Sequence, residues 1–172
     1  DVIDIDEEKV NAININKSPV NEKEFINYFD TNKVSIKAFQ NREELELDYD
    51  FVIICLPTNY NFNDKVLDTV LVEDYIDFFV QESNTKIIIK STVSICFTDS
   101  QIKKYNNERI SFSPEFLREG TSIEDCMKPS RIIYGPKNIC SMAFDKIIQK
   151  SLEKKVNKTR YMSASEAEAV KL

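Results

Sequence analysis

Glycine is scarce in this sequence, and histidine is absent. The 172 residues include only Gly120 and Gly135, where average usage of about 7% would give roughly a dozen glycines. So few glycines leave little material for a glycine-rich phosphate-binding loop. There is no histidine, and the four cysteines show no Cys-x-x-Cys spacing. We therefore expect no metal site and no disulfide framework.

The chain also lacks an excess of positive charge and a long apolar run. Its formal net charge is -6, whereas a nucleic-acid or anionic membrane surface needs clustered Lys and Arg. No apolar run approaches the roughly 18 residues of a membrane span, and the acidic start lacks the basic region of a secretion signal. We expect no nucleic-acid partner, no membrane association and a cytoplasmic location.

Short runs rich in β-branched and aromatic residues alternate with helical patterns along the chain. The near-continuous apolar run 51–56 is typical of a strand buried on both faces of a parallel sheet, and Cys55 within it is expected to pack as a small hydrophobe. We expect strands at 2–5, 34–39, 51–56, 86–91, 110–112, 131–134 and 159–162. The alternation predicts an α/β fold with a doubly wound, mostly parallel Rossmann-like sheet.

The segments between the strands predict helices, caps and one loop. Val72, Ile76 and Phe79 recur at helical spacing, residues 142–152 outline another helix, and the acids at 6–8 favour a helix start. Residues 57–65 read as a loop. Ser163 should cap a new helix. We therefore divide the chain into one domain, 1–162, and the start of a following helix, 163–172.

Polar residues directly follow two of the expected strands. Thr92 closes the run after 86–91, and the sequence Ser-Pro-Glu-Phe-Leu-Arg-Glu-Gly at 113–120 follows 110–112. In open α/β sheets, ligands bind in the crevice outside the carboxyl ends of the strands. These residues therefore predict a ligand site at that edge of the sheet.

The chain resembles the UDP-glucose 6-dehydrogenases over essentially its whole length. The resemblance is carried, in matching order and spacing, by segments 55–58, 89–93, 112–120, 129–133 and 166–172. It implies NAD as cofactor, UDP-glucose as substrate and a homodimer of the complete protein. It also implies that a first strand and a Gly-x-Gly-x-x-Gly turn precede Asp1, which would explain the few glycines and leave the sheet incomplete at its amino end.

The resemblance further implies a reaction. The C6 hydroxyl of UDP-glucose would be oxidised to a carboxylate in two hydride transfers, through a cysteine-bound thiohemiacetal and then a thioester that water hydrolyses. None of the four cysteines here has the Gly-rich context of that nucleophile. We therefore expect the 172 residues alone to be inactive.

Five residues resemble positions that hold the cofactor. Asp4 would accept hydrogen bonds from the adenosine ribose, Lys9 would lie near the same ribose, and Thr58 would approach the cofactor. Glu119 would lie beside the nicotinamide, and Thr92 would also contact the cofactor. From the residues alone, Asp4 could equally be a helix-capping acid, Lys9 a surface lysine and Thr58 a turn residue.

The resemblance assigns catalytic roles to Thr92, Glu119 and Lys171. Thr92 would hold a catalytic water, Glu119 would act as general base, and the Lys171 ammonium would stabilise a developing alkoxide. Arg131 is interpreted as structural. The residues that would line the sugar-nucleotide site are Glu115, Phe116, Leu117, Arg118 and Lys171.

The sequence departs from the family at Ser94 and Cys96, where Pro and Gly are usual. If that glycine adopts a positive φ, Cys96 strains its loop by about 1 kcal/mol or more. Two alternatives stay open: a GDP-mannose 6-dehydrogenase, which shares a similar Pro-Glu-Phe-Leu-Arg-Glu segment, and a degenerate, non-catalytic nucleotide-binding remnant.

Overall fold

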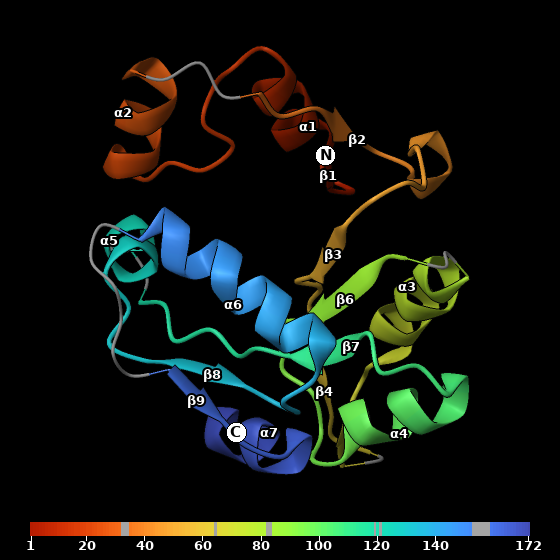
Figure 1. The fold of residues 1–172 in the computed structure, drawn as a ribbon. Coiled ribbons are helices and arrows are strands. Elements are labelled where there is room, and N and C mark those ends of the chain that lie inside the picture. The colour runs from red at the N-terminus through yellow and green to blue at the C-terminus, as the bar shows by residue number, and fades with distance from the viewer. Residues whose placement is uncertain (32–34, 64, 82–83, 119, 121, 153–158) are drawn as a thin grey trace. The chain divides into compact units, whose positions relative to one another are not determined.

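A computed structural model describes residues 1–31, 35–63, 65–81, 84–118, 120, 122–152 and 159–172. The chain divides into two compact units (Figure 1). The first comprises Asp1–Leu47 and Arg118–Ile123, and the second comprises Asp48–Leu117 and Glu124–Leu172. Each unit is described by itself.

The first unit contains two parallel strands with two helices between them along the chain. Strands β1 (Val2–Ile3) and β2 (Ala38–Phe39) pair in parallel, and α1 (Glu7–Asn14) follows β1. The Asp6 side chain caps α1 by accepting the backbone N–H groups of Glu8 and Lys9, so the predicted helix start is confirmed. Two further elements complete the unit: α2 (Lys23–Thr31) and the 3-10 helix η1 (Arg42–Glu44).

The second unit contains a three-stranded parallel sheet in the order β3-β6-β7. Its strands are β3 (Phe51–Ile54), β6 (Lys86–Ile89) and β7 (Ile110–Phe112). Because the strands are parallel, their carboxyl ends meet at one edge. The remaining elements are β4 (Tyr60–Asn61), β5 (Val66–Leu67), α3 (Val70–Val80), α4 (Phe97–Tyr105), α5 (Ser122–Met127, which spans the unit boundary), β8 (Ile132–Tyr134), α6 (Ile139–Ser151), β9 (Thr159–Tyr161) and α7 (Ala164–Lys171).

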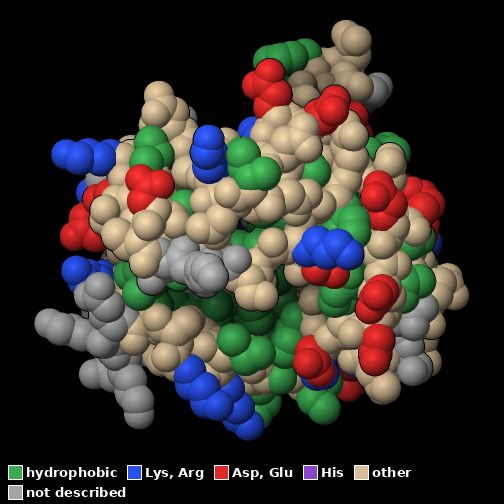
Figure 2. All heavy atoms as spheres, turned by 90° about the horizontal axis from the view of Figure 1, so that it is seen from above, with side chains coloured by type: hydrophobic (Ala, Val, Ile, Leu, Met, Phe, Trp, Pro, Cys, Tyr) green, Lys and Arg blue, Asp and Glu red, His purple; other side chains and the backbone are tan. Residues whose placement is uncertain are grey.

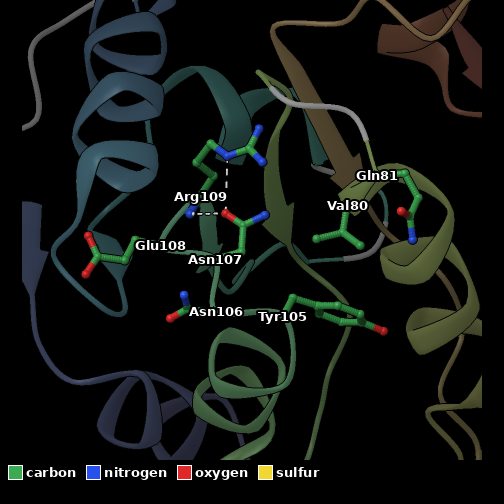
Figure 3. A pocket seen from close by; sticks show the side chains of 7 residues that line it. All are labelled: Val80, Gln81, Tyr105, Asn106, Asn107, Glu108 and Arg109. Carbon is green, nitrogen blue, oxygen red and sulfur yellow. Dashed lines mark hydrogen bonds between the residues drawn. The ribbon is translucent and has the colours of Figure 1, made fainter.

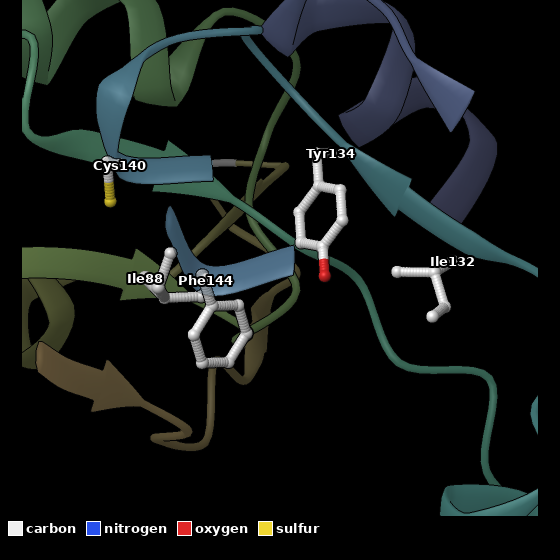
Figure 4. Close-up of a cluster of buried hydrophobic side chains, with 5 residues drawn as sticks. All are labelled: Ile88, Ile132, Tyr134, Cys140 and Phe144. Carbon is white, nitrogen blue, oxygen red and sulfur yellow. The ribbon is translucent and has the colours of Figure 1, made fainter. Parts of the chain in front are cut away.

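Helices cover the central strand of this sheet from two sides. In Figure 1, α3 and α6 flank β6 on opposite sides. Successive side chains of a strand point to opposite faces, and Ile87, Ile88 and Ile89 are all buried. Ile88 packs on the α6 side in a cluster with Ile132, Tyr134, Cys140 and Phe144 (Figure 4). This two-sided burial explains why the strand is apolar from Ile87 to Ile89.

Helix α7 packs tightly against the end of β8. Ser163 caps the helix in a reciprocal pair with Glu166, as the sequence predicts. Gly135, just after β8, lies so close to α7 that an added Cβ would be 2.7 Å from the Ser163 carbonyl oxygen and 2.8 Å from Ala164 Cα. A side chain at position 135 is therefore incompatible with the position of α7.

The structure confirms the α/β class and the parallel pairing, and a strand lies within each predicted range. Two local expectations are wrong. Residues 57–65 are not simply a loop, because β4 pairs antiparallel with β5. The sheet edge strand β3 is not buried on both faces, since Ile53 is 47% exposed.

The described part of the chain lacks two kinds of feature. No helix there combines the length and the hydropathy that a bilayer crossing needs. No cluster of three or more His, Cys, Asp or Glu side chains there could hold a metal ion.

Replacing Gly135 with Ala tests the contact between β8 and α7. The added methyl would overlap backbone atoms of α7 that cannot move independently of the helix, so we expect a loss of about 3 kcal/mol in the free energy of unfolding. Gly120→Ala is the matched control. Gly120 has φ 78° but open space around it, so backbone strain alone costs about 1 kcal/mol. Equal urea midpoints for the two variants would contradict the tight packing of α7.

Candidate functional site

A pocket of about 560 Å³ lies at the carboxyl ends of β3 and β6 in the second unit. Residues following the two strands form most of its wall, and α7 closes it with a lysine. This is the edge of a parallel sheet where α/β proteins bind ligands. The lining residues are Cys55, Leu56, Pro57, Thr58, Lys90, Ser91, Thr92, Glu115, Leu117 and Lys171.

Thr58 and Thr92 join the two strand ends that form the wall. The Thr58 hydroxyl donates to the backbone carbonyl of Thr92 at 2.5 Å. Behind them, the backbone N–H groups of Lys90 and Ser91 donate to the carbonyl of Ile54. The wall is therefore hydrogen-bonded across the strands, and its residues have little freedom to move apart.

Glu115 is the polar centre of the pocket. Its carboxylate pairs with the Lys90 ammonium at 2.8 Å, and its backbone carbonyl accepts a hydrogen bond from Lys171 Nζ at 3.0 Å. Lys90 is largely enclosed, with 15% of its side chain exposed. The Lys90 charge is thus neutralised locally, whereas the described hydrogen bond of Lys171 is to a neutral carbonyl.

Phe116 lies close to two cationic side chains. The Arg131 guanidinium lies 4.6 Å from the centre of the Phe116 ring, and Lys171 Nζ lies 6.0 Å from it. Such contacts are attractive because the ring face carries negative potential. Arg131 therefore holds the Phe116 ring, and with it the segment that carries Glu115.

Cys55 corrects an expectation. It does not pack as a core hydrophobe but is exposed and lines the pocket. Crowding by surrounding protein atoms, followed by the negative charge of Glu115, raises the pKa of the Cys55 thiol to about 11, against an opposing effect of Lys90. The thiol is therefore protonated at neutral pH.

The other predicted site residues lie elsewhere. Asp4 and Lys9 are in the first unit, where Lys9 Nζ is 3.7 Å from the Asp4 carboxylate at the carboxyl end of β1. Asp4 also accepts the backbone N–H of Asp6 at 2.9 Å, so part of its alternative, local role is observed. Arg118 also belongs to the first unit. Glu119 lies outside the described residues.

Cys96 has the left-handed backbone that its position suggested. Its φ is 70° and its ψ is 7°, immediately before α4. A side chain in this region costs roughly 1–2 kcal/mol, which glycine avoids. The positive φ that was expected to strain a cysteine at this position is therefore confirmed.

A second hollow lies at the opposite edge of the sheet (Figure 3). It is lined by Val80, Gln81 and residues 105–109, which precede β7. The Arg109 side chain already donates to Asn107 Oδ1 at 3.2 Å and to the Thr85 carbonyl at 3.2 Å. In Figure 3 the Tyr105 ring and the Glu108 carboxylate point away from each other. The groups do not converge, so the first pocket is the better candidate site.

Sequence reasoning missed Lys90 and the contact through which Arg131 plays its structural role. Lys90 stands in the Lys-Ser-Thr run that ends β6, and that position at the ligand edge could have identified it. Arg131 gave no such signal, because its contact with Phe116 joins residues from separate segments.

The chain matches known proteins over most of its length. Residues 1–158 match the UDP-glucose/GDP-mannose dehydrogenase family, NAD binding domain. The chain is 39% identical over 172 residues to a UDP-glucose 6-dehydrogenase of Campylobacter jejuni, covering 99% of this chain and 44% of that protein. It is 36% identical over 135 residues to one of Streptococcus pneumoniae, covering 78% of this chain and 34% of that protein. The chain thus spans less than half the length of these relatives.

Solved structures share the fold. A GDP-mannose dehydrogenase from Pseudomonas aeruginosa superposes with a TM-score of 0.80 at 21% identity, covering 99% of this chain and 42% of that one. A UDP-glucose dehydrogenase from Pyrobaculum islandicum gives 0.78 at 22%, with the same coverage. At these identities the likeness concerns the fold. The sequence matches also show the family. The chain belongs to the UDP-glucose/GDP-mannose dehydrogenase family, with residues 1–158 corresponding to its NAD binding domain.

Proposed function

We propose that these residues form part of an NAD-dependent dehydrogenase that oxidises the C6 hydroxyl of UDP-glucose to a carboxylate in two hydride transfers. The observation that carries the proposal is the pocket at the carboxyl ends of β3 and β6, where Thr92 and Lys171 line one cavity with Glu115. The name of the 39% identical Campylobacter relative supports UDP-glucose over GDP-mannose.

The described residues suit the chemistry of alcohol oxidation. An alkoxide develops on the C6 oxygen as its proton leaves, and the Lys171 ammonium would stabilise that charge, since its described contact is with a neutral carbonyl. Thr92 would hold the water that later attacks the acyl carbon, with Glu119 as the general base. Glu115, Phe116, Leu117 and Arg118 would line the sugar-nucleotide site.

The residues present fit NAD. The Asp4 carboxylate lies at the carboxyl end of a parallel strand with its side chain 35% exposed, so it can accept hydrogen bonds from ribose hydroxyls, with Lys9 beside it. Thr58 and Thr92 lie at the corresponding edge of the second unit. When bound, NAD would accept the hydride from C6.

The expected partners are few. On the face shown in Figure 2, Lys and Arg side chains are interspersed with Asp and Glu rather than gathered into one basic surface. This supports a small-molecule substrate rather than a nucleic acid. A homodimer of the complete protein, a cytoplasmic location and the division into residues 1–162 and 163–172 stay proposals.

The first test measures NADH formation. A full-length protein containing these residues should form about two NADH per UDP-glucose, because each hydride transfer reduces one NAD. Residues 1–172 alone should form less than one NADH per protein molecule, since they contain neither a Gly-x-Gly-x-x-Gly turn nor a cysteine in the Gly-rich context that the resemblance implies for the nucleophile. A preference of the full-length protein for GDP-mannose would favour a GDP-mannose 6-dehydrogenase. No NADH with either sugar nucleotide would favour a degenerate, non-catalytic remnant.

Substituting Lys171 tests the charge at the pocket. In the full-length protein, Lys171→Met should lower kcat by about 10²–10³-fold, the range expected when one stabilising donor is removed from a developing oxyanion. Lys150→Met, which removes an exposed lysine near the end of α6, is the matched control and should leave kcat within about twofold. Steady-state rates at saturating NAD and UDP-glucose measure both. An unchanged kcat for Lys171→Met would exclude this role.

Cys55 should not be the covalent nucleophile, although it lines the pocket. With a pKa of about 11, roughly one thiol in 10⁴ is ionised at pH 7. In the full-length protein, Cys55→Ser should therefore keep kcat within about threefold. Alkylation of Cys55 by iodoacetamide should instead accelerate about tenfold per pH unit up to pH 10. Loss of turnover in Cys55→Ser, or rapid alkylation at pH 7, would contradict this.

A further inference from the structure

Glu168 is a buried acid that the proposed chemistry does not use. It lies on α7 with no exposed surface. Its Oε2 accepts the backbone N–H of Cys96 at 2.7 Å, and its Oε1 accepts that of Thr98 at 2.8 Å. Both carboxylate oxygens are therefore engaged by the first backbone N–H groups of α4, which lack partners within their own helix.

This contact joins the two segments that bring Thr92 and Lys171 to the pocket. Thr92 lies four residues before Cys96, in the segment that enters α4. Lys171 lies three residues after Glu168, about one turn further along α7. A displacement of α7 relative to α4 would therefore move both pocket residues relative to each other.

The contact also explains how cysteine is tolerated at position 96. Its φ of 70° is unfavourable for a residue with a side chain. The hydrogen bond from its N–H to a carboxylate is charge-assisted and therefore stronger than one to a neutral acceptor. This bond offsets the strain and fixes the direction in which the chain enters α4.

The Glu168 carboxyl is buried, and the groups around it shift its pKa in opposite directions. The pKa of its carboxyl lies above the usual value, because burial and the charge of Asp99 raise it more than the hydrogen bonds from Thr98 and Cys96 lower it. The carboxylate lies at the amino end of α4, where the helix dipole favours negative charge. Burying an acid is unfavourable unless its oxygens are satisfied, so the fold retains this group at a cost.

We propose that Glu168 is a positioning residue, whose carboxylate holds α7 against the start of α4 and thereby fixes Lys171 and Thr92 in the pocket. The effect of this contact on catalysis rests on the proposed function, because only that function gives Lys171 and Thr92 their catalytic roles. The link itself is a property of the described residues and can be tested without substrate.

The test uses amide hydrogen exchange and NMR chemical shifts of the 172-residue chain. Glu168→Gln keeps the size but places an NH₂ group against one of the two N–H donors. We expect exchange of the Cys96 and Thr98 amides to accelerate by at least tenfold, and the Lys171 and Thr92 resonances to shift. The matched control is Glu166→Gln on the same helix, which alters the cap at Ser163 and should leave the Cys96 and Thr98 amides unchanged.

A second substitution separates positioning from stability alone. Cys96→Gly relieves the left-handed strain, so it should raise the folding equilibrium constant by about fivefold or more. Combined with Glu168→Gln, it should recover stability without restoring the link, and the Lys171 and Thr92 resonances should stay displaced. If those resonances return to wild-type positions as stability recovers, or never shift in Glu168→Gln, the proposal is overturned.

Two further arms keep the outcome decisive. If Glu168→Gln does not fold, Glu168→Asp keeps the charge but shortens the reach by one methylene, and the same shifts are read against the same criteria. In the full-length protein, Glu168→Gln should lower kcat by about 10–100-fold, because misplacement by about 1 Å can cost that much. An inactive wild-type protein with displaced resonances in the variant would refute the proposed function and leave the positioning role intact.

Discussion

The candidate site depends on where α7 lies, and two contacts determine its position. One is the close approach of the α7 backbone to Gly135, where a Cβ would lie 2.7 Å from the Ser163 carbonyl oxygen. The other is the buried Glu168 carboxylate, which accepts two backbone N–H groups at the start of α4. The first contact sets the depth of the helix against β8, and the second restricts its position against α4. Lys171 reaches the pocket because both are satisfied.

The two lysines of the pocket have different partners. Lys90 pairs with the Glu115 carboxylate, which neutralises its charge, whereas Lys171 does not pair with that carboxylate. The Glu115 carboxylate lies 2.8 Å from the Lys90 ammonium, while the Glu115 backbone carbonyl accepts a hydrogen bond from Lys171 Nζ. A carbonyl oxygen orients an ammonium without removing its net charge. The single residue Glu115 thus holds two lysines in different electrostatic states, which suits a site where negative charge develops on a ligand.

Much of the architecture could be predicted from the sequence, because periodicity and apolar runs report local burial. The strand ranges, the α3 stripe of Val72, Ile76 and Phe79 and the Ser163 cap all follow from neighbours along the chain. The β4–β5 hairpin was missed because its two-residue strands are too short to show an alternation. Cys55 was misjudged because its apolar run, 51–56, extends two residues beyond the end of β3 at Ile54.

The site was predictable only in part, for a related reason. Thr92 and Lys171 were identified through family motifs, and the structure brings both to one pocket. The contacts that hold them there join residues far apart in the chain: Arg131 with Phe116, Lys90 with Glu115, and Glu168 with Cys96. No pattern in a single sequence encodes such pairs, because each half reads alone as an ordinary charged or aromatic residue.

The cysteine at position 96 shows how a local departure can be absorbed by a distant residue. Judged from its own backbone, φ 70° predicts a strained and therefore poorly defined turn. The Glu168 carboxylate changes that judgement, since a charge-assisted hydrogen bond of 2.7 Å acts on the same peptide group that carries the strain. The glycine that is usual here in the family would carry less strain at this φ and would depend less on the hydrogen bond to Glu168. The turn beyond Thr92 is thus defined by a contact 72 residues away along the chain rather than by its own sequence.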